Sequence, residues 1–405
     1  MTVRGWCPGA LRPMPSGDGL IVRLKLTGGI VDIGLARRIA AWSSRWGNGQ
    51  IDLSNRANLQ LRGLRAEHLR DLHSAMAVEG LLDGSEAGEA VRNVIASPLA
   101  GLDPDAALDI RPVVRSLEQR LARDVFLRAL PGKFGFAIDD GGRFGLDDVP
   151  ADIRFVARQG PAFTIHLGGA EPTRLGPVSP EAVSDVAASL AGIFMQHAGV
   201  RRMRDLVAVR GSEAIGREAG LDPLPTLRPA RRPRPFLGAR VLGSAGLLGV
   251  GLPFGRMAAE DLAALAGAAA AIGAEDLRLT PWRAILLPAA SVGAAAALAA
   301  TLPADAFILD PDDPRRRIAA CPGAPSCDWA RGAVRQDAAV LAGAIGKAAI
   351  TVHVSGCEKG CAHPAAAPVT LIARNGRYDL VCNGNASSVP ALRDLTLAQV
   401  AERLR

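Results

Sequence analysis

GIVDIGLARRIAAWSSRWGNGQIDLSNRANLQL, residues 29–61, aligns without a gap on GRMAAEDLAALAGAAAAIGAEDLRLTPWRAILL, residues 255–287, at an offset of 226 residues. The matched positions include Gly47 with Gly273, Leu59 with Ile285 and Leu61 with Leu287. Because the second copy is rich in Ala, chance similarity is the alternative to a duplication. We interpret the match as an internal repeat and expect the fold to be built from two related halves.

Each copy has the same order of predicted elements. A strand comes first, at residues 20–26 and 246–252, and a helix follows; in the first copy its apolar residues, Leu35, Ile39, Trp42 and Trp46, recur at helical spacing. A strand, a turn and a second strand complete the unit. This β-α-β-β order is half of a ferredoxin-like arrangement.

The segments after each unit also resemble one another, with strand-like runs at 134–138 and 163–167 and at 350–354, 369–373 and 378–382. We therefore predict an α+β fold with duplicated architecture and pseudo-twofold symmetry, in which a site at the junction draws on both halves. The predicted parts are a half-domain at 1–80, a larger α+β domain at 81–223, a Pro- and Arg-rich linker at 224–238, a second half-domain at 239–305 and a second α+β domain at 306–405.

The composition indicates a globular protein of more than one domain. The chain has 405 residues, of which 49% are hydrophobic and 21% charged. Its net charge of +7 comes almost entirely from scattered Arg, and only 4% of residues are aromatic. Since single-stranded nucleic acid needs stacking platforms, we expect no nucleic-acid partner. The start of the chain lacks an apolar signal segment, and residues 284–300 are too short and too interrupted to span a membrane, so we expect a cytoplasmic location.

Four of the six cysteines form two pairs. Cys321 and Cys327 lie in C-P-G-A-P-S-C, and Cys357 and Cys361 lie in S-G-C-E-K-G-C-A-H-P. Four thiolates are what a [4Fe-4S] cluster needs, and nearby Gly and Pro favour loops whose N–H groups approach the sulfurs. Zinc is the rival, although structural zinc sites favour closer pairs, and unligated thiols are the remaining alternative.

These cysteine spacings resemble the cluster signature of the nitrite and sulfite reductases, which couple a [4Fe-4S] cluster to sirohaem. The resemblance implies that Cys361 also bridges to the sirohaem iron. Three further stretches in the first half resemble motifs of that family: Asn55–Gly63, Arg92-Asn93-Val94 and Leu130–Phe134. They occur in the family's order, so the resemblance covers nearly the whole chain.

A uroporphyrin-derived macrocycle carries many carboxylates, and Arg binds carboxylate through two hydrogen bonds. With Arg56 and Arg62 six residues apart on a predicted strand, their side chains share a face with Asn58 and Gln60. A solvent-exposed strand face is the alternative. By resemblance, the tetrapyrrole-binding residues are Arg56, Asn58, Gln60, Arg62, Asn93 and Arg283, and the catalytic cations are Arg56, Arg92 and Lys133.

The chain departs from the sulfite reductases at two positions. Gly132 replaces a basic residue, and Gly135 stands where those enzymes carry a second Lys. Because reduction of a small oxyanion needs dense positive charge, these losses argue against sulfite or nitrite as the substrate. Sirohaem-dependent sulfite or nitrite reduction is the alternative function, and a non-catalytic electron carrier is a third.

Another branch of the family, the precorrin-3B synthases of cobalamin biosynthesis, is similar in three stretches: Arg4–Leu20, Pro253–Arg256 and Thr280–Arg283. This resemblance implies a monooxygenase that uses O₂ to hydroxylate precorrin-3A at C20 and closes a γ-lactone. It implies NADH as the ultimate electron donor, through a separate reductase. The tetrapyrrole pocket would then hold the substrate.

The identity of the iron that activates O₂ stays open between sirohaem and a mononuclear non-haem iron. His353, His363 and Glu358 lie near the cysteines as candidate ligands, without the pattern of a facial triad. Cys7 and Cys382 are interpreted as non-ligands.

Overall fold

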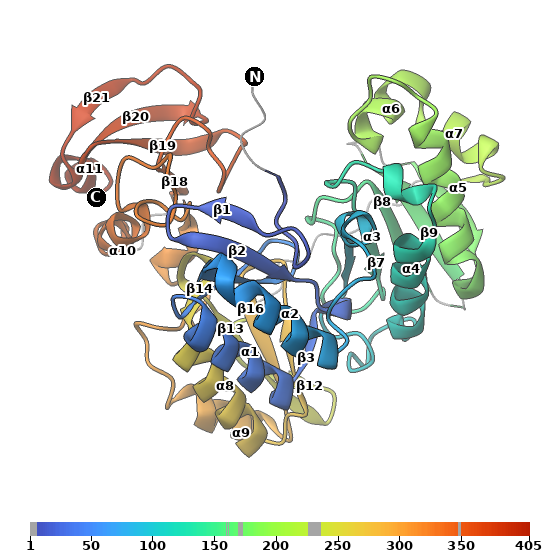
Figure 1. Ribbon diagram of the computed structural model, residues 1–405, viewed down its shortest axis with the longest axis horizontal. Helices are drawn as coiled ribbons and strands as arrows, with labels where there is room; N and C mark the ends of the chain where they lie inside the picture. The colour runs from blue at the N-terminus through green and yellow to red at the C-terminus, as the bar shows by residue number, and fades with distance from the viewer. Residues whose placement is uncertain (1–5, 159, 161, 169–172, 226–235, 347–349) are drawn as a thin grey trace.

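The computed structural model describes residues 6–158, 160, 162–168, 173–225, 236–346 and 350–405 (Figure 1). Most of the predicted linker lies outside the described residues, at 226–235, as do Arg4 and Gly5 of the first branch-specific stretch. Within the described residues, no helix is long and apolar enough to cross a membrane.

The first half-domain follows the predicted β-α-β-β order and ends in a second helix. Its elements are β1 (Met14–Ser16), β2 (Gly19–Leu24), β3 (Ile30–Asp32), α1 (Ile33–Trp46), β4 (Gln50–Leu53), β5 (Leu59–Leu64) and α2 (Leu69–Val78). Asp32 caps α1 by accepting a hydrogen bond of 2.8 Å from the backbone N–H of Leu35. Leu35, Ile39 and Trp42 are buried, so the apolar face inferred from the sequence is confirmed.

The second half-domain repeats this order. Its elements are β12 (Gly238–Leu242), β13 (Ala245–Gly251), β14 (Arg256–Ala258), α8 (Ala259–Ala271), β15 (Asp276–Leu279), β16 (Ala284–Ala289) and α9 (Val292–Ala299). From β2 to β5 the elements align with those from β13 to β16 at the offset read from the sequence.

The two half-domains exchange a strand. β14 pairs with β4 in the sheet β1-β2-β5-β4-β14, and β3 pairs with β15 in the sheet β12-β13-β16-β15-β3. Helices α1 and α8 pack on each other, and one hydrophobic core contains residues of both half-domains. The half-domains therefore form one central body with pseudo-twofold symmetry.

The two larger domains carry sheets that begin in the same way. One has the order β11-β10-β9-β8-β7-β6 and the other β17-β18-β19-β20-β21. In each sheet, the three strands that come first in sequence run parallel to one another, and the fourth pairs antiparallel with the third. β6 to β9 therefore correspond to β17 to β20. The strands are β6 (Val94–Ala96), β7 (Phe136–Asp139), β8 (Ile153–Arg158), β9 (Ala162–Leu167), β10 (Arg174–Val178), β11 (Pro223–Leu224), β17 (Ile318–Ala320), β18 (Val352–Ser355), β19 (Ala367–Arg374), β20 (Arg377–Gly384) and β21 (Leu392–Leu395).

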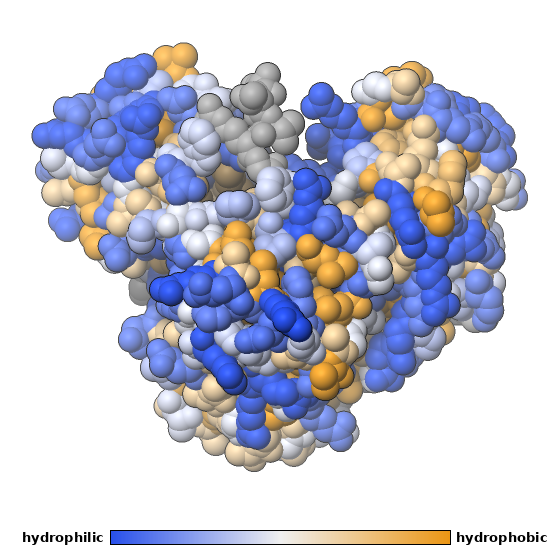
Figure 2. Space-filling model, viewed as in Figure 1, coloured by the Kyte–Doolittle hydropathy of each residue, from blue (hydrophilic) through white to orange (hydrophobic). Residues whose placement is uncertain are grey.

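Helices cover these sheets and complete two lobes on the central body. The first domain has α3 (Glu86–Val91), α4 (Arg111–Arg123), α5 (Val183–Met195), α6 (Met203–Arg210) and α7 (Ser212–Glu218), and the second has α10 (Val334–Ile345) and α11 (Leu397–Arg403). Figure 2 shows the lobes apart at the top, with hydrophilic residues over most of the visible face. A site between the lobes is therefore built from both halves of the chain.

Candidate iron-sulfur and tetrapyrrole site

The four paired cysteines follow two neighbouring strands. Cys321 and Cys327 come after β17, and Cys357 and Cys361 come after β18, which runs parallel to β17. Because parallel strands end at the same edge of a sheet, the two loops meet there. The thiols are close enough to influence one another, with Cys321 interacting with Cys327 and Cys361, and Cys361 with Cys357.

Glycines bring the backbone close to these sulfurs. The N–H of Gly356 donates a hydrogen bond of 3.1 Å to Sγ of Cys321, and a Cβ on Gly356 would lie 2.7 Å from Cβ of Ala330. Burial raises the pKa values of the Cys321 and Cys361 thiols. Backbone N–H groups of Gly356 and Gly323 act in the opposite direction on Cys321 by stabilising its thiolate.

Four thiols on two neighbouring loops are the donor set of a [4Fe-4S] cluster. A zinc ion needs four sulfurs each about 2.3 Å from one centre. Within the described residues, no three side chains of His, Cys, Asp or Glu lie close enough together to hold one metal ion. A [4Fe-4S] cluster binds one thiolate on each of four irons and therefore holds the sulfurs farther apart. The four cysteines fit such a cluster.

The three candidate non-haem iron ligands separate into two groups. The rings of His353 and His363 lie 5.8 Å apart, whereas Glu358 forms an ion pair of 2.7 Å with Arg374. His353 is fully buried, and burial lowers its pKa to about 4. Neither of its ring nitrogens has a hydrogen-bond partner among the described residues. The described residues therefore do not assemble a facial triad from these three side chains.

Arg56 lies in a turn rather than on the predicted strand. β4 ends at Leu53 and β5 begins at Leu59, and Ala57 in the turn between them has a φ of 54°. The hydroxyl of Ser54 accepts hydrogen bonds from the backbone N–H groups of Arg56 and Asn58 and stabilises this turn. The strand prediction was wrong here because side chain–backbone bonds favour a tight reversal.

This turn brings Arg56 to the first larger domain and to the cysteines. Nη2 of Arg56 donates a hydrogen bond of 2.9 Å to the carbonyl oxygen of Lys133, and its Nη1 is buried with no hydrogen-bond partner in the part of the chain that the structure describes. Burial lowers the pKa of Arg56. Lys133 is exposed and interacts electrostatically with Cys361. The first half of the chain thus meets the cysteine loops at this point.

A group of polar side chains, which we call the cationic site, surrounds a small cavity of about 10 Å³ beside Arg56. Its polar members are Lys25, Arg56, Asn58, Arg92, Asn93 and Glu118. Arg92 is held by Asp83 at 2.8 Å and by Glu118 at 3.4 Å. Asn93 donates hydrogen bonds to the carbonyl oxygens of Gly132 and Phe134, at 3.2 and 3.1 Å, and so fixes the segment that carries Lys133.

Lys25 belongs to this site although the sequence analysis did not identify it. Its ammonium is buried, donates a hydrogen bond of 3.0 Å to Oδ1 of Asn93 and also bonds to the carbonyl oxygen of Glu89. Burial is the largest influence that lowers its pKa to about 7, and Arg92 adds to the effect. The feature of the sequence that could have identified Lys25 is its position directly after a strand with buried residues, β2. Lys25 lines the same cavity as Arg56.

Arg62 does not fit its predicted role in tetrapyrrole binding. It is 1% exposed, and its three side-chain nitrogens donate to Asp18, Asp52 and the carbonyl oxygen of Ser326, among others. Gln60 on the same strand accepts hydrogen bonds of 3.2 and 2.7 Å from Arg23. Arg62 is buried because it pairs with the carboxylates of Asp18 and Asp52. Its hydrogen bond to Ser326 holds the loop between Cys321 and Cys327.

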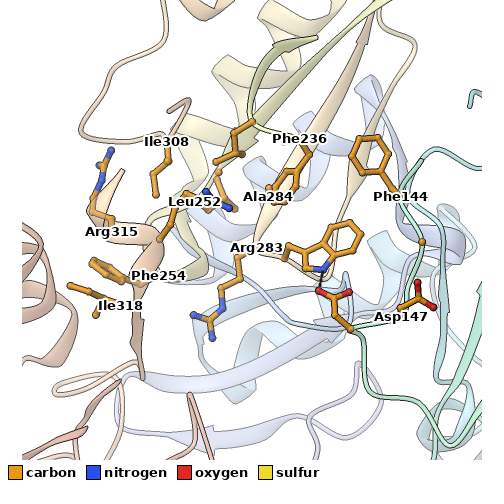
Figure 3. Close-up of a pocket in the computed structure, with 16 residues that line it drawn as sticks. Phe144, Asp147, Phe236, Leu252, Phe254, Arg283, Ala284, Ile308, Arg315 and Ile318 are labelled. Atoms are coloured by element: carbon orange, nitrogen blue, oxygen red, sulfur yellow. Dashed lines mark hydrogen bonds between the residues drawn. The ribbon is translucent and has the colours of Figure 1, made fainter. Parts of the chain in front are cut away.

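Arg283 also lies apart from the cationic site. It lines a larger cavity, with Phe236, Phe254 and Trp282 among the other lining residues (Figure 3). Cys7 is exposed and interacts with Arg23 and Arg56, and Cys382 is exposed on β20. Of the residues predicted to bind the tetrapyrrole, Arg62 and Arg283 therefore do not line the cationic site.

Comparison with known families agrees with this architecture. Residues 12–78 and 244–304 match the nitrite/sulfite reductase ferredoxin-like half domain, and residues 87–260 match the nitrite and sulphite reductase 4Fe-4S domain. The first pair of matches supports the duplication inferred from the sequence. The match to the 4Fe-4S domain covers the larger domain in the first half of the chain. The four cysteines lie in the larger domain of the second half.

Individual relatives come from the same group of enzymes. The chain is 34% identical to a precorrin-3B synthase of Sinorhizobium sp. over 96% of this chain and 84% of the relative. It is 27% identical to a ferredoxin–nitrite reductase of Synechococcus elongatus, over 91% of this chain and 78% of that protein. The solved structure of the Mycobacterium tuberculosis NirA protein superposes with a TM-score of 0.74 at 21% identity, covering 95% of this chain and 79% of that one, and supports the fold. The chain therefore belongs to the nitrite and sulfite reductase family, within which it is similar to precorrin-3B synthase over nearly its whole length.

Proposed function

We propose that this protein is a precorrin-3B synthase that converts precorrin-3A to precorrin-3B. In the proposed reaction one atom of O₂ becomes the C20 hydroxyl group, and the other leaves as water. NADH supplies two electrons through a separate reductase, and an acetate side chain of the substrate closes the γ-lactone. The oxidoreductase relatives and the 34% identity to a precorrin-3B synthase support this assignment.

One structural observation carries the proposal. Lys25 and Arg56 of the first half line one cavity, and Lys133 beside them interacts with Cys361 of the second half. Cationic groups for a polycarboxylate ligand and thiolates for a cluster therefore meet at one junction. A bound [4Fe-4S] cluster supplies single electrons.

The roles of the protein groups follow from their surroundings. Arg56 has a buried nitrogen that no described residue hydrogen-bonds, and this nitrogen would form a charge-assisted hydrogen bond with a ligand carboxylate. Lys25 and Lys133 would add charge on either side of it. Because the cavity of about 10 Å³ is too small for a macrocycle, we propose that the tetrapyrrole lies across its mouth, toward the cysteine loops.

Arg92 is already neutralised by Asp83 and Glu118, so its proposed role is to orient the loop between α3 and β6. Gly132 and Gly135 leave more room and less charge over the reacting face than two basic side chains would. That environment favours a bulky ligand over a small oxyanion such as sulfite or nitrite. The O₂-activating iron is proposed as either sirohaem or a mononuclear non-haem iron.

The experiment is a turnover assay on protein purified without oxygen. With a reductant, precorrin-3A and O₂, we expect a product that contains one additional oxygen atom by mass spectrometry. Arg56→Gln is expected to weaken substrate binding by about tenfold or more, whereas Arg65→Gln, an exposed control nearby, retains it. Reduction of sulfite or nitrite with a viologen donor, and no oxygenated product, would instead favour the reductase function.

The visible spectrum of the same preparation separates the two candidates for iron. Soret and α bands would place sirohaem in the protein and refute the idea that the substrate occupies the cofactor position. A broad iron–sulfur shoulder without those bands would support that idea.

A further inference from the structure

We propose that the cavity around Trp282 and Arg283 is a second binding site, for a flat conjugated anion. The proposal concerns a region outside the site assigned above, and only the choice of tetrapyrrole as one probe rests on the proposed function. We call this region the aromatic cavity; its distinctive lining residues are Phe144, Phe236, Phe254, Trp282, Arg283 and Arg316.

The aromatic cavity is the pseudosymmetric counterpart of the cationic site. Four of its lining residues lie 226 positions after four residues of that site: Gly251 for Lys25, Leu252 for Leu26, Trp282 for Arg56 and Ala284 for Asn58. Ile318 begins β17 as Val94 begins β6, and both line their respective cavities. The same elements therefore build two binding sites, one in each half.

The substitutions change both the size and the chemistry of the second copy. Replacing a Lys by Gly251 and an Asn by Ala284 removes bulk and polarity, and the cavity volume is about 510 Å³ compared with about 10 Å³ in the cationic site. A volume of this size is within the range of small-molecule sites. The loop after β7 supplies Phe144 where the corresponding loop after β18 supplies cysteines. This copy therefore suits binding rather than electron transfer.

Aromatic rings make the walls of this cavity suited to a planar ligand. The rings of Phe236 and Trp282 lie 5.6 Å apart and are tilted by 32°, and the guanidinium of Arg316 lies 5.7 Å from the ring of Phe236. Nε1 of Trp282 donates a hydrogen bond of 3.0 Å to Asp148, which fixes the indole. Rigid aromatic faces favour stacking with a conjugated ring system.

Arg283 supplies the anion-binding group. Within the described part of the chain its guanidinium has no hydrogen-bond or ion-pair partner, and burial lowers its pKa while the charge of Asp52 opposes that effect. Figure 3 shows its side chain between Phe254 and Asp147. By contrast, Arg315 at the edge of the cavity is fully engaged by Asp313 at 2.7 Å and by backbone carbonyl oxygens. A half-buried, unpaired guanidinium favours a carboxylate or phosphate on the ligand.

Asp147 and Asp148 limit the number of negative charges that the cavity accepts. Both line the cavity from the first larger domain, together with Arg283 and Arg316 of the second half of the chain. A ligand with a conjugated ring, few anionic groups and an N–H donor for Asp147 fits this distribution better than one with carboxylates on every edge.

The test uses the cluster-containing full chain and two probes with this shared chemistry, flavin mononucleotide and protoporphyrin IX, whose two propionates lie on one edge of the macrocycle. Equilibrium dialysis measures binding without turnover, so a negative result here leaves the proposed function untouched. Binding of the flavin alone indicates a nucleotide-like ligand, and binding of the porphyrin alone indicates a tetrapyrrole.

Two variants test whether the probe binds in the aromatic cavity. Arg283→Gln and Trp282→Ala are each expected to weaken binding of the bound probe by about tenfold or more, with an unchanged melting temperature confirming the fold. Arg65→Gln changes an exposed guanidinium that lines neither site, and this control is expected to leave the binding unaltered. The proposal is refuted if neither probe binds saturably below about 1 mM, or if Arg56→Gln abolishes binding while the two cavity variants do not.

Discussion

The guanidinium of Arg62 on β5 donates a hydrogen bond of 2.6 Å to the carbonyl oxygen of Ser326, 264 residues later in the chain. Ser326 lies between Cys321 and Cys327, so a strand of the first half-domain holds a cysteine loop of the last domain. The hydroxyl of Ser16 donates to the same oxygen at 2.6 Å. The geometry of the cysteine site therefore depends on residues that are distant from it in sequence.

Loss of Arg62 is expected to impair assembly of the cluster. Arg62→Met removes the buried cation that pairs with Asp18, takes away one of the three cations around Asp52 and releases the loop at Ser326, so we expect a destabilisation of about 3–5 kcal/mol and a lower iron content. Iron and acid-labile sulfide assays with urea unfolding measure both effects. Arg65→Met removes an exposed guanidinium three residues later and serves as the control. Full iron content in Arg62→Met would contradict the role of this contact.

Asp52 joins three cationic side chains from different parts of the chain. Its carboxylate lies 2.7 Å from Arg256, 2.7 Å from Arg335 and 3.3 Å from Arg62. Burial by itself raises the pKa of Asp52, but Arg335, Arg256 and Arg62 outweigh it and hold that pKa well below its usual value. The resulting stabilisation is present above the unfolded-state pKa of about 3.9 and is lost as the pH falls toward the folded-state value.

Asp52→Asn is therefore expected to lower the free energy of unfolding by about 3–5 kcal/mol at pH 7, because three cations lose their counterion. The difference from the unmodified protein should shrink as the pH falls from about 4 toward 2. Urea unfolding across this range measures it, with the exposed Asp71→Asn as the control. A difference that is constant with pH would show that Asp52 does not ionise as described.

The buried charge of Lys25 is expected to lower the free energy of unfolding while it favours binding of an anionic ligand. Its pKa of about 7 in the folded protein lies below the value of 10.5 expected in the unfolded chain, so the unfolded state binds more protons between these values. Stability should therefore rise as the pH increases from about 7 toward 10, and the cost of the buried charge is fully present below about 7.

Lys25→Met should remove this pH-dependent rise and increase the free energy of unfolding at pH 6 by roughly 1–3 kcal/mol, since part of the gain is offset by lost hydrogen bonds. It should also weaken binding of a polycarboxylate tetrapyrrole. Denaturation between pH 6 and 10 tests the first effect and spectral titration the second. Lys133→Met removes an exposed ammonium from the same region and is expected to leave the pH dependence of stability unchanged.

Cys361→Ser is expected to lose the cluster and all turnover. The iron content should fall from about four atoms per chain toward zero, or toward a partial cluster with three, together with the visible absorbance. Cys382→Ser changes an exposed thiol on β20 and should retain iron and activity. Retention of the cluster and activity in Cys361→Ser would overturn the assignment of this ligand.

The local order of the half-domains could be read from the sequence because it depends on short-range patterns. The apolar spacing of Leu35, Ile39 and Trp42 predicted α1, and the offset of 226 residues predicted its partner α8. The exchange of β3 and β14 could not be read in this way. These strands are three residues long, and their pairing arises only when two half-domains pack together.

The sequence by itself determined the duplicated α+β architecture and the two cysteine pairs that the fold places in neighbouring loops, because repeats and short spacings are local properties of the chain. Only the tertiary structure decided the roles of individual cations. The sequence pattern does not distinguish Arg56 from Arg62. In the structure, Arg56 lies in a turn with one nitrogen that has no partner among the described residues, whereas Arg62 is buried between Asp18 and Asp52. Lys25 and Arg283 were likewise assigned by their surroundings. The charge that a side chain offers to a ligand depends on which partners the fold has already given it, and those partners come from distant parts of the chain.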